Sequence, residues 1–73
     1  MKEDIIIDDL GCHWRWSPLR GKILCIEAED EMRNDPNITA EERLNNGYYA
    51  DNFDDGVSLL YEYGYITKKD KLD

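Results

Sequence analysis

The apolar residues of this chain come in short runs, and this feature most limits what the chain can fold into. The longest runs are Ile5–Ile7 and Ile23–Ile26. Neither approaches the length of a membrane span or of the hydrophobic region of a signal peptide. A chain of 73 residues is also near the lower size limit for a stable core, since it buries only about 60% of its unfolded surface. We therefore expect one small soluble domain, 1–73, in the cytoplasm.

Negative charge is concentrated in the middle of the sequence. The chain has 17 acidic and 9 basic residues, which gives a net charge of −8. Residues 27–62 carry eleven of the acids against only Arg33 and Arg43. A field of this sign repels nucleic-acid phosphates and anionic lipid surfaces. We therefore expect no direct binding to nucleic acid or membranes, and a basic protein as the partner.

The first part of the chain has the pattern of extended structure. Three consecutive isoleucines within 3–9 predict a short strand, because β-branched residues favour strands. Residues 12–16 alternate, so that Trp14 and Trp16 share one face if this segment is extended. The segment 1–16 is therefore expected to form a strand or a hairpin.

Two readings of the following segment, 17–34, are open. Ser17 can cap a helix, and Pro18 fits the first helical turn, which favours a helix over the whole segment. Gly21 is the objection to that helix. In the alternative reading, residues 18–21 form a turn and 22–28 form a strand that pairs back onto 12–16.

The segment 39–66 has clearer helix signals. Thr39 and Glu42 have the spacing of a capping box, and the helix that they open is expected to carry Leu44 and Tyr48 on one side. That helix weakens at Asn45–Gly47.

A last helix is expected to begin with Asp54 or Asp55 as its N-cap. Its inward stripe is formed by Val57, Leu60 and Tyr61. Gly64 is expected to end this helix in the left-handed conformation, with 65–66 folding back over the helix end.

These elements predict a mainly α domain of three short helices with an N-terminal strand or hairpin. The alternative is an α+β fold, with a three-stranded antiparallel sheet followed by two helices. Residues 67–73 are expected to form a flexible basic tail. The predicted core consists of Leu19, Ile23, Ile26, Leu44, Val57 and Leu60, completed by Trp14 or Trp16.

The two cysteines are expected to be free thiols, and a single disulfide between them is the alternative. Small disulfide-rich scaffolds usually carry four or more cysteines, and this chain has only Cys12 and Cys25. A structural zinc site usually needs four ligands in close pairs. The single histidine, His13, would point away from Cys12 on a strand. No metal or cofactor is therefore predicted.

The twelve residues from Asp51 to Glu62 partly match a calcium-binding EF-hand loop. Positions one, five, six and twelve fit the pattern. Phe53, however, stands at position three, where an oxygen ligand is required. The favoured interpretation is an acidic helix N-terminus, and a cation-responsive domain is the weakest functional alternative.

No catalytic set is marked in the sequence. His13 beside Cys12 supplies residue types for a nucleophile and a base, but no third residue is placed to orient them. Adjacent carboxylates such as Glu41 and Glu42 on a solvated surface serve solubility and capping. We therefore predict that the protein is not an enzyme and has no catalytic residues.

The leading functional hypothesis is a protein-binding inhibitor or modulator whose acidic surface imitates nucleic acid. In composition the chain resembles small phage or plasmid proteins that block host nucleic-acid-binding proteins. The alternative is an adaptor or subunit whose acidity serves only solubility. The predicted partner-binding residues are Glu27, Glu29, Asp30, Glu31, Glu41, Asp51, Asp54, Asp55, Tyr48, Tyr49 and Trp16.

Overall fold

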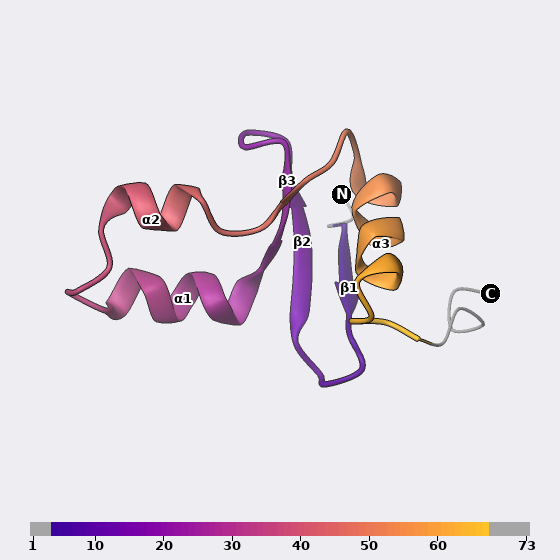
Figure 1. Ribbon diagram of the computed structural model, residues 1–73, viewed down its shortest axis with the longest axis horizontal. Helices are drawn as coiled ribbons and strands as arrows, with labels where there is room; N and C mark the ends of the chain where they lie inside the picture. Colours follow the sequence, from indigo (N-terminus) through magenta and orange to yellow (C-terminus); the bar gives the residue numbers. More distant parts are fainter. Residues whose placement is uncertain (1–3, 68–73) are drawn as a thin grey trace.

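The computed structural model describes residues 4–67. Within these residues, a four-stranded antiparallel sheet with the strand order β1-β2-β3-β4 is accompanied by three helices (Figure 1). The prediction of a mainly helical domain is therefore wrong, and the α+β alternative gives the class correctly. Along the chain, the elements are β1 (Ile5–Ile7), β2 (His13–Ser17), β3 (Lys22–Cys25), α1 (Ile26–Asn34), α2 (Ala40–Leu44), β4 (Tyr48–Tyr49) and α3 (Phe53–Glu62).

Residues 18–25 decide the fold class, because they form a turn and a strand rather than the first part of a helix. Gly21 has a φ of +65°, a left-handed backbone that glycine adopts without strain. Its N–H donates to the Ser17 carbonyl at 2.8 Å, and the Arg20 N–H donates to Ser17 Oγ at 3.3 Å. Ser17 thus closes a hairpin turn instead of capping a helix. The expected helix over 17–34 exists only from Ile26 onward.

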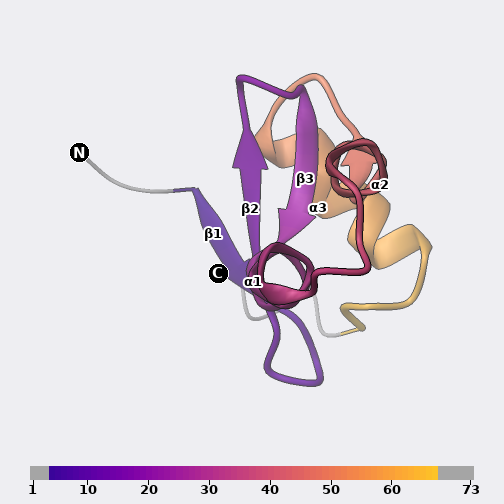
Figure 2. The same ribbon diagram turned by 90° about the vertical axis from the view of Figure 1, so that its left-hand side faces the viewer.

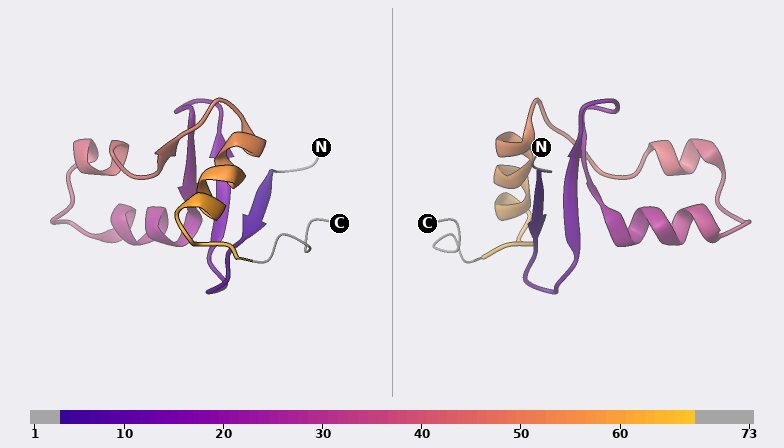
Figure 3. Two further views of the ribbon diagram at one scale, coloured as in Figure 1. Left: turned by 45° about the vertical axis from the view of Figure 1, so that its right-hand side comes forward. Right: turned by 180° about the vertical axis from the view of Figure 1, so that it is seen from behind.

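Side chains alternate between the two faces of the sheet, and α3 covers one of these faces (Figure 3). The register places Ile6 opposite Trp14 and Trp16 opposite Ile23. Helix α3 contacts β2, β3 and β4. The core lies between this helix and the sheet, and its buried cluster consists of Trp14, Ile23, Leu60 and Ile66.

The predicted core is partly correct. The structure buries Ile23, Val57 and Leu60 as expected, and Trp14 is the tryptophan that completes the core. Leu19 was expected inside but is 94% exposed, because it lies in the hairpin turn rather than on a helix. Leu44 is 57% exposed on α2, and Ile26 is half-buried at the start of α1. The loss of the long helix explains the position of Leu19 and Ile26.

A buried carboxylate organises the turn between β1 and β2. Asp8 is only 5% exposed. Its Oδ1 accepts the N–H groups of Leu10 and Cys12, each at 2.9 Å, and its Oδ2 accepts the indole N–H of Trp14 at 2.9 Å. These three bonds compensate for the loss of solvation that burial of a charge entails.

A buried ammonium group joins the sheet to α2. Lys22 of β3 is 4% exposed, and its Nζ donates to the carbonyls of Leu44 at 2.7 Å and Asn46 at 3.3 Å. The same Nζ lies 4.5 Å from the ring centre of Tyr49, within range of a cation–π contact. A cation at the C-terminus of a helix satisfies its free carbonyls, so Lys22 holds the end of α2 against β3.

In the segment 39–66, two helix ends agree with the sequence signals and the N-cap of the last helix does not. The capping box between Thr39 and Glu42 is present, and Gly64 has a φ of +88° after α3. The backbone N–H groups of Tyr65 and Ile66 donate to the Leu60 carbonyl, which folds these residues back over the helix end. The N-cap of α3 is not Asp54 or Asp55, as expected, but Asn52, whose side chain accepts from the N–H of Asp55.

The helix α2 is shorter than the sequence indicated, since it ends at Leu44. Tyr48, which was expected on the same helix, lies instead on β4. Among residues 4–67, no helix is long and apolar enough to cross a membrane. Of the predicted flexible tail, only Thr67 is described, and its hydroxyl donates to Asp9 at 2.6 Å. Residues 68–73 lie outside the described part of the chain.

The core position of Leu60 gives a first prediction. Leu60 is fully buried, so Leu60→Ala should lower the free energy of unfolding by about 2–4 kcal/mol. The exposed Leu19 is the matched control, and Leu19→Ala should change stability by less than about 0.5 kcal/mol. Urea unfolding followed by circular dichroism measures both values, and equal losses would contradict the described core.

The close approach of α3 to β3 gives a second prediction. A Cβ added at Gly56 would lie 2.8 Å from Cδ1 and 2.9 Å from Cβ of Ile23, which is fully buried. In an open helix, Gly→Ala stabilises by up to about 1 kcal/mol. At Gly56 the added methyl group overpacks the contact with β3. Gly56→Ala should therefore lower the free energy of unfolding by about 1–3 kcal/mol instead of raising it.

The exposed Ser58 on the same helix is the control for Gly56. Ser58→Ala should leave the thermal midpoint unchanged or raise it slightly, because alanine is the better helix former. A rise of the midpoint in Gly56→Ala would show that α3 does not pack closely on Ile23.

Candidate functional site

The helices α1 and α2 form an acidic arm, residues 26–44, that projects from one end of the molecule (Figures 1 and 2). The two helices lie side by side and run in opposite directions. Neither contains a buried residue. The arm carries seven carboxylates against two arginines, so its main physical property is its negative charge rather than a contribution to the core.

Two of the predicted partner-binding carboxylates on the acidic arm are held by residues outside the arm. Glu27 accepts from the backbone and ring of His13. Glu29 accepts from Arg20 at 3.0 Å and from the Asn46 amide at 2.8 Å. These contacts fix the base of the arm against the hairpin and the segment after α2.

The tip of the acidic arm carries freer carboxylates. Asp30 pairs with Arg33 at 3.2 Å on the same helix, but both groups are more than half exposed, which makes this ion pair weak. Glu31 and Glu41 are exposed, and their carboxylates make no hydrogen bond or ion pair in the described part of the chain. Of the predicted acids on the arm, Glu31 and Glu41 are therefore the two whose carboxylates have no partner among residues 4–67, and they lie on α1 and α2.

The remaining predicted acids form a second surface at the other end of the molecule. Asp51, Asp54 and Asp55 are exposed around the start of α3, where the helix dipole favours negative charge. Tyr49, 77% exposed, lies beside them. A hollow of about 360 Å³ is lined by Tyr49, Ala50, Asp51, Asp55, Ser58 and Leu59.

The structure thus divides the predicted binding residues between two separate surfaces (Figure 1). The partial EF-hand match also loses its geometric basis, because Phe53–Glu62 form α3 rather than a loop. Gly56, matched to the sharp turn of such a loop, is instead a buried helical residue against Ile23.

Two predicted partner-binding aromatics serve packing. The Tyr48 ring lies in a cluster with Trp14, Tyr63 and Tyr65. Its hydroxyl is 2.7 Å from that of Tyr65, and this hydrogen bond, together with partial burial, raises the pKa of Tyr48 to about 12. The half-buried Trp16 donates its indole N–H to the Ala50 carbonyl at 3.0 Å. Of the predicted aromatics, only Tyr49 has a largely exposed ring.

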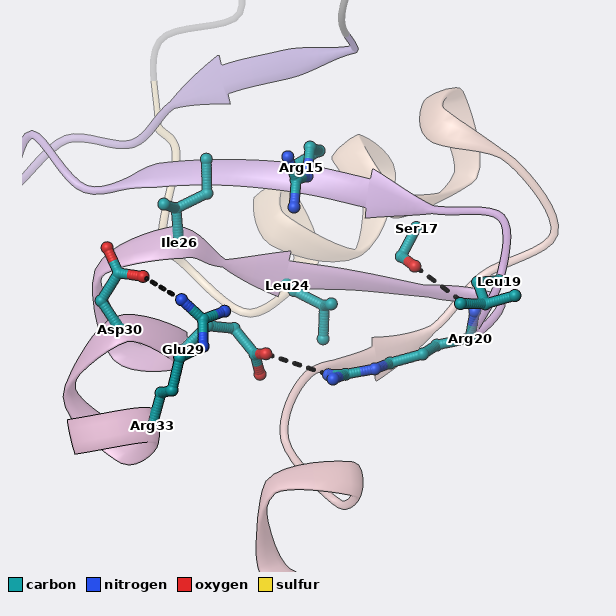
Figure 4. A pocket seen from close by; sticks show the side chains of 9 residues that line it. All are labelled: Arg15, Ser17, Leu19, Arg20, Leu24, Ile26, Glu29, Asp30 and Arg33. Atoms are coloured by element: carbon teal, nitrogen blue, oxygen red, sulfur yellow. Dashed lines mark hydrogen bonds and ion pairs between the residues drawn. The ribbon is translucent and has the colours of Figure 1, made fainter. Parts of the chain in front are cut away.

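A small pocket between the hairpin and α1 gathers three of the four arginines of the chain, although sequence reasoning did not identify it (Figure 4). Arg20 and Arg33 are paired with Glu29 and Asp30 across it. The cavity volume is about 210 Å³. The pairing of these charges largely neutralises the pocket, which therefore interrupts the negative surface of the arm.

A cluster of reactive side chains lies where the hairpin meets the start of α1. The thiol sulfurs of Cys12 and Cys25 and a carboxylate oxygen of Glu27 all lie within 4.8 Å of one another. Both cysteines are free thiols, as expected. They line a cavity of about 460 Å³ together with the rings of Trp14, Tyr48 and Tyr65 and several polar groups. Sequence reasoning missed this cluster because it depends on the hairpin register.

The ionisation of this cluster follows from its surroundings. Partial burial raises the pKa of the Cys12 thiol, and the negative charges of Asp8 and Glu27 raise it further. A thiol in such a field is not activated as a nucleophile. The backbone N–H and ring of His13 lower the pKa of Glu27 to about 2. Because an ionised carboxylate only accepts hydrogen bonds, Nδ1 of His13 is the donor in their 2.7 Å contact.

Comparison with protein-family models, with curated proteins and with solved structures gives no match for this chain. Function therefore has to be inferred from the contacts, charges and exposed surfaces described above. Of these surfaces, the acidic arm carries the most carboxylates, and its two helices contain no buried residue.

The His13–Glu27 contact gives a prediction for pH dependence. The Glu27 carboxyl should titrate at about pH 2, against an ordinary value of 4.5, as measured by NMR. A lowered pKa means that this contact stabilises the fold fully above pH 4.5 and stops doing so as the pH falls through about 2. In His13→Ala the backbone donor remains, so the pKa should rise only part of the way.

The matched control is Glu31→Gln on the same helix. That variant should leave the Glu27 titration unchanged, because Glu31 has no contact with this pair. A Glu27 midpoint near 4.5 in the unmodified protein would contradict the described contact.

Proposed function

We propose that this protein is a non-enzymatic binding protein that inhibits or modulates a basic partner through the acidic arm. The partner class is a protein with a cationic surface, and a nucleic-acid-binding protein is the best fit. Such proteins hold phosphates with lysine and arginine side chains, and exposed carboxylates can occupy the same groups. We place this activity in the cytoplasm.

One observation carries the proposal: α1 and α2 are held in place at the base of the arm but bury none of their residues. Helices that do not build the core need another reason to carry six carboxylates in an ordered arrangement. Lys22 and Glu29 anchor the arm to the sheet and hairpin. Fixed charges bind a complementary surface at a smaller entropic cost than charges on a disordered tail.

The adaptor hypothesis, in which acidity serves only solubility, makes a different claim about the same surface. It requires total charge but no particular location. Two variants with the same number of reversed charges, one on the arm and one elsewhere, therefore distinguish the two hypotheses.

The test uses the full chain as bait for partners in a cell lysate, followed by binding measurements with each purified partner. The proposal expects a basic partner whose binding weakens steeply between low and physiological salt, where the Debye length falls to about 8 Å. Duplex DNA added in excess should compete with the protein for that partner.

Charge reversal at the tip of the arm is the decisive variant. Glu31→Lys combined with Glu41→Lys should weaken binding by at least about tenfold, or 1.4 kcal/mol, because it replaces two exposed attractive charges with repulsive ones. The matched control, Asp4→Lys combined with Glu62→Lys, changes the net charge equally at exposed positions outside the arm. This control should retain most of the affinity.

The contrary outcomes are distinct. Equal losses in both pairs would show that total charge alone matters and would support the adaptor hypothesis. A loss confined to Asp51→Lys combined with Asp54→Lys would move the interface to the start of α3.

A further inference from the structure

The cysteine cluster is assembled by three elements that meet at one corner of the sheet. Cys12 ends the β1–β2 turn, Cys25 ends β3, and Glu27 lies in the first turn of α1. The register sets Trp14 opposite Cys25, so Cys12 lies beside the point where β3 becomes α1. The backbone N–H of His13 donates to Glu27 Oε1 at 2.8 Å, which fixes the carboxylate beside the two sulfurs.

We propose that Cys12, Cys25 and Glu27 bind one thiophilic divalent metal ion of the zinc class, leaving a fourth coordination position open. In a tetrahedral site with metal–sulfur bonds of about 2.3 Å and metal–oxygen bonds of about 2.1 Å, the ligand atoms are about 3.5–3.8 Å apart. Cys25 Sγ already lies 3.7 Å from Glu27 Oε1, and all three ligand atoms lie within 4.8 Å of one another. A small movement of the three side chains toward one another therefore gives the distances of a tetrahedral site.

The orientation of Glu27 fits this role. Its Oε2 accepts from His13 Nδ1 at 2.7 Å, and its Oε1 accepts from the His13 backbone. The Cys25 thiol donates to the same Oε1. A metal ion that replaces the thiol protons would therefore lie between the sulfurs and Oε1, on the side of this oxygen that the His13 N–H does not occupy. Ligands held by such neighbouring hydrogen bonds bind metals more tightly. His13 is thus a positioning residue and not a ligand.

The charges of the corner also favour a cation. The buried carboxylate of Asp8 and the three ligands supply negative charge, and no lysine or arginine lines the adjoining cavity in the described part of the chain. Two thiolates select zinc-like ions over calcium and magnesium, which prefer oxygen ligands. This ligand chemistry separates the site from the partial EF-hand pattern, whose carboxylates lie on α3 and just before it.

The cavity beside the cluster supplies the open position. Both cysteines line this space of about 460 Å³, which is large enough for water or a small donor molecule. Three protein ligands and one exchangeable position are typical of zinc sites that react or respond to ligands, whereas structural sites are closed by four protein ligands. The proposal does not depend on the acidic arm as a partner-binding surface.

The test uses Co²⁺ as a spectroscopic probe with the full chain, reduced by a non-thiol reductant. We expect one equivalent of Co²⁺ to give thiolate-to-cobalt charge-transfer absorption, and one equivalent of Zn²⁺ to remove it. Cys12→Ser and Cys25→Ser should each lower the affinity by at least about a hundredfold and reduce that absorption. Circular dichroism of the metal-free variants shows whether they are folded.

The carboxylate and its positioning residue have their own variants. Glu27→Gln should weaken binding by at least about tenfold while keeping the charge-transfer absorption at saturation. His13→Ala should weaken binding about 10–100-fold, and His13→Asn, whose amide can still donate to Glu27, should recover most of the affinity. The control Glu62→Gln removes an exposed carboxylate from α3 and should bind as the unmodified protein does.

Several outcomes would overturn the proposal. One is the absence of charge-transfer absorption at stoichiometric Co²⁺, and another is unchanged affinity in either cysteine variant. Saturation at half an equivalent would show two chains sharing an ion, which contradicts the open position. Equal affinity for Ca²⁺ and Zn²⁺ would show a surface cation effect instead of thiolate binding.

Discussion

The structure depends on the burial of one carboxylate, that of Asp8. A charge removed from water must be compensated by hydrogen bonds, and Asp8 obtains three of them from the turn that follows it and from the indole of Trp14. Trp14 is the central aromatic residue of the core and contacts the rings of Tyr48 and Tyr65. One side chain therefore sets the β1–β2 turn, the orientation of the main core residue and the position of Cys12.

Lys22 has the corresponding role for the acidic arm. Its ammonium group is buried against backbone carbonyls at the end of α2 rather than against a carboxylate. Asp8 and Lys22 are thus the two buried charged residues in the described part of the chain, one of each sign. The arm is attached through polar contacts at its base, and the hydrophobic core lies elsewhere, between α3 and the sheet.

Sequence reasoning succeeded where structure is set by nearby residues and failed where it is set by distant ones. The capping box at Thr39, the stripe containing Leu60 and the left-handed Gly64 are local signals, and all three were correct. The segment 18–25 has apolar residues that suit a helix or a strand, and the choice between them depends on pairing with β2 and β4. Cys12 comes close to Cys25 only if 22–25 form a strand that pairs with β2, so the cysteine cluster could not be predicted while the helix was favoured.

The candidate site could be predicted only in part for the same reason. The excess of acids was evident from composition, but their division between the arm and the start of α3 required the path of the chain. The packing of Tyr48 and Trp16 could not be predicted either, because the sequence does not show whether an aromatic ring is buried in the core or exposed to solvent. Burial of Lys22 runs against the usual preference of lysine for the surface, so no sequence pattern indicates it.

The absence of buried residues in α1 and α2 has a consequence for how this protein can change over generations. Substitutions in a core are constrained by volume and packing, whereas exposed helical positions tolerate most residues within about 0.5 kcal/mol. Mutations in the arm can therefore alter charge number and spacing while the sheet and α3 keep the chain folded. The charge pattern of α1 and α2 is therefore free to vary independently of the sequence that folds the sheet and α3.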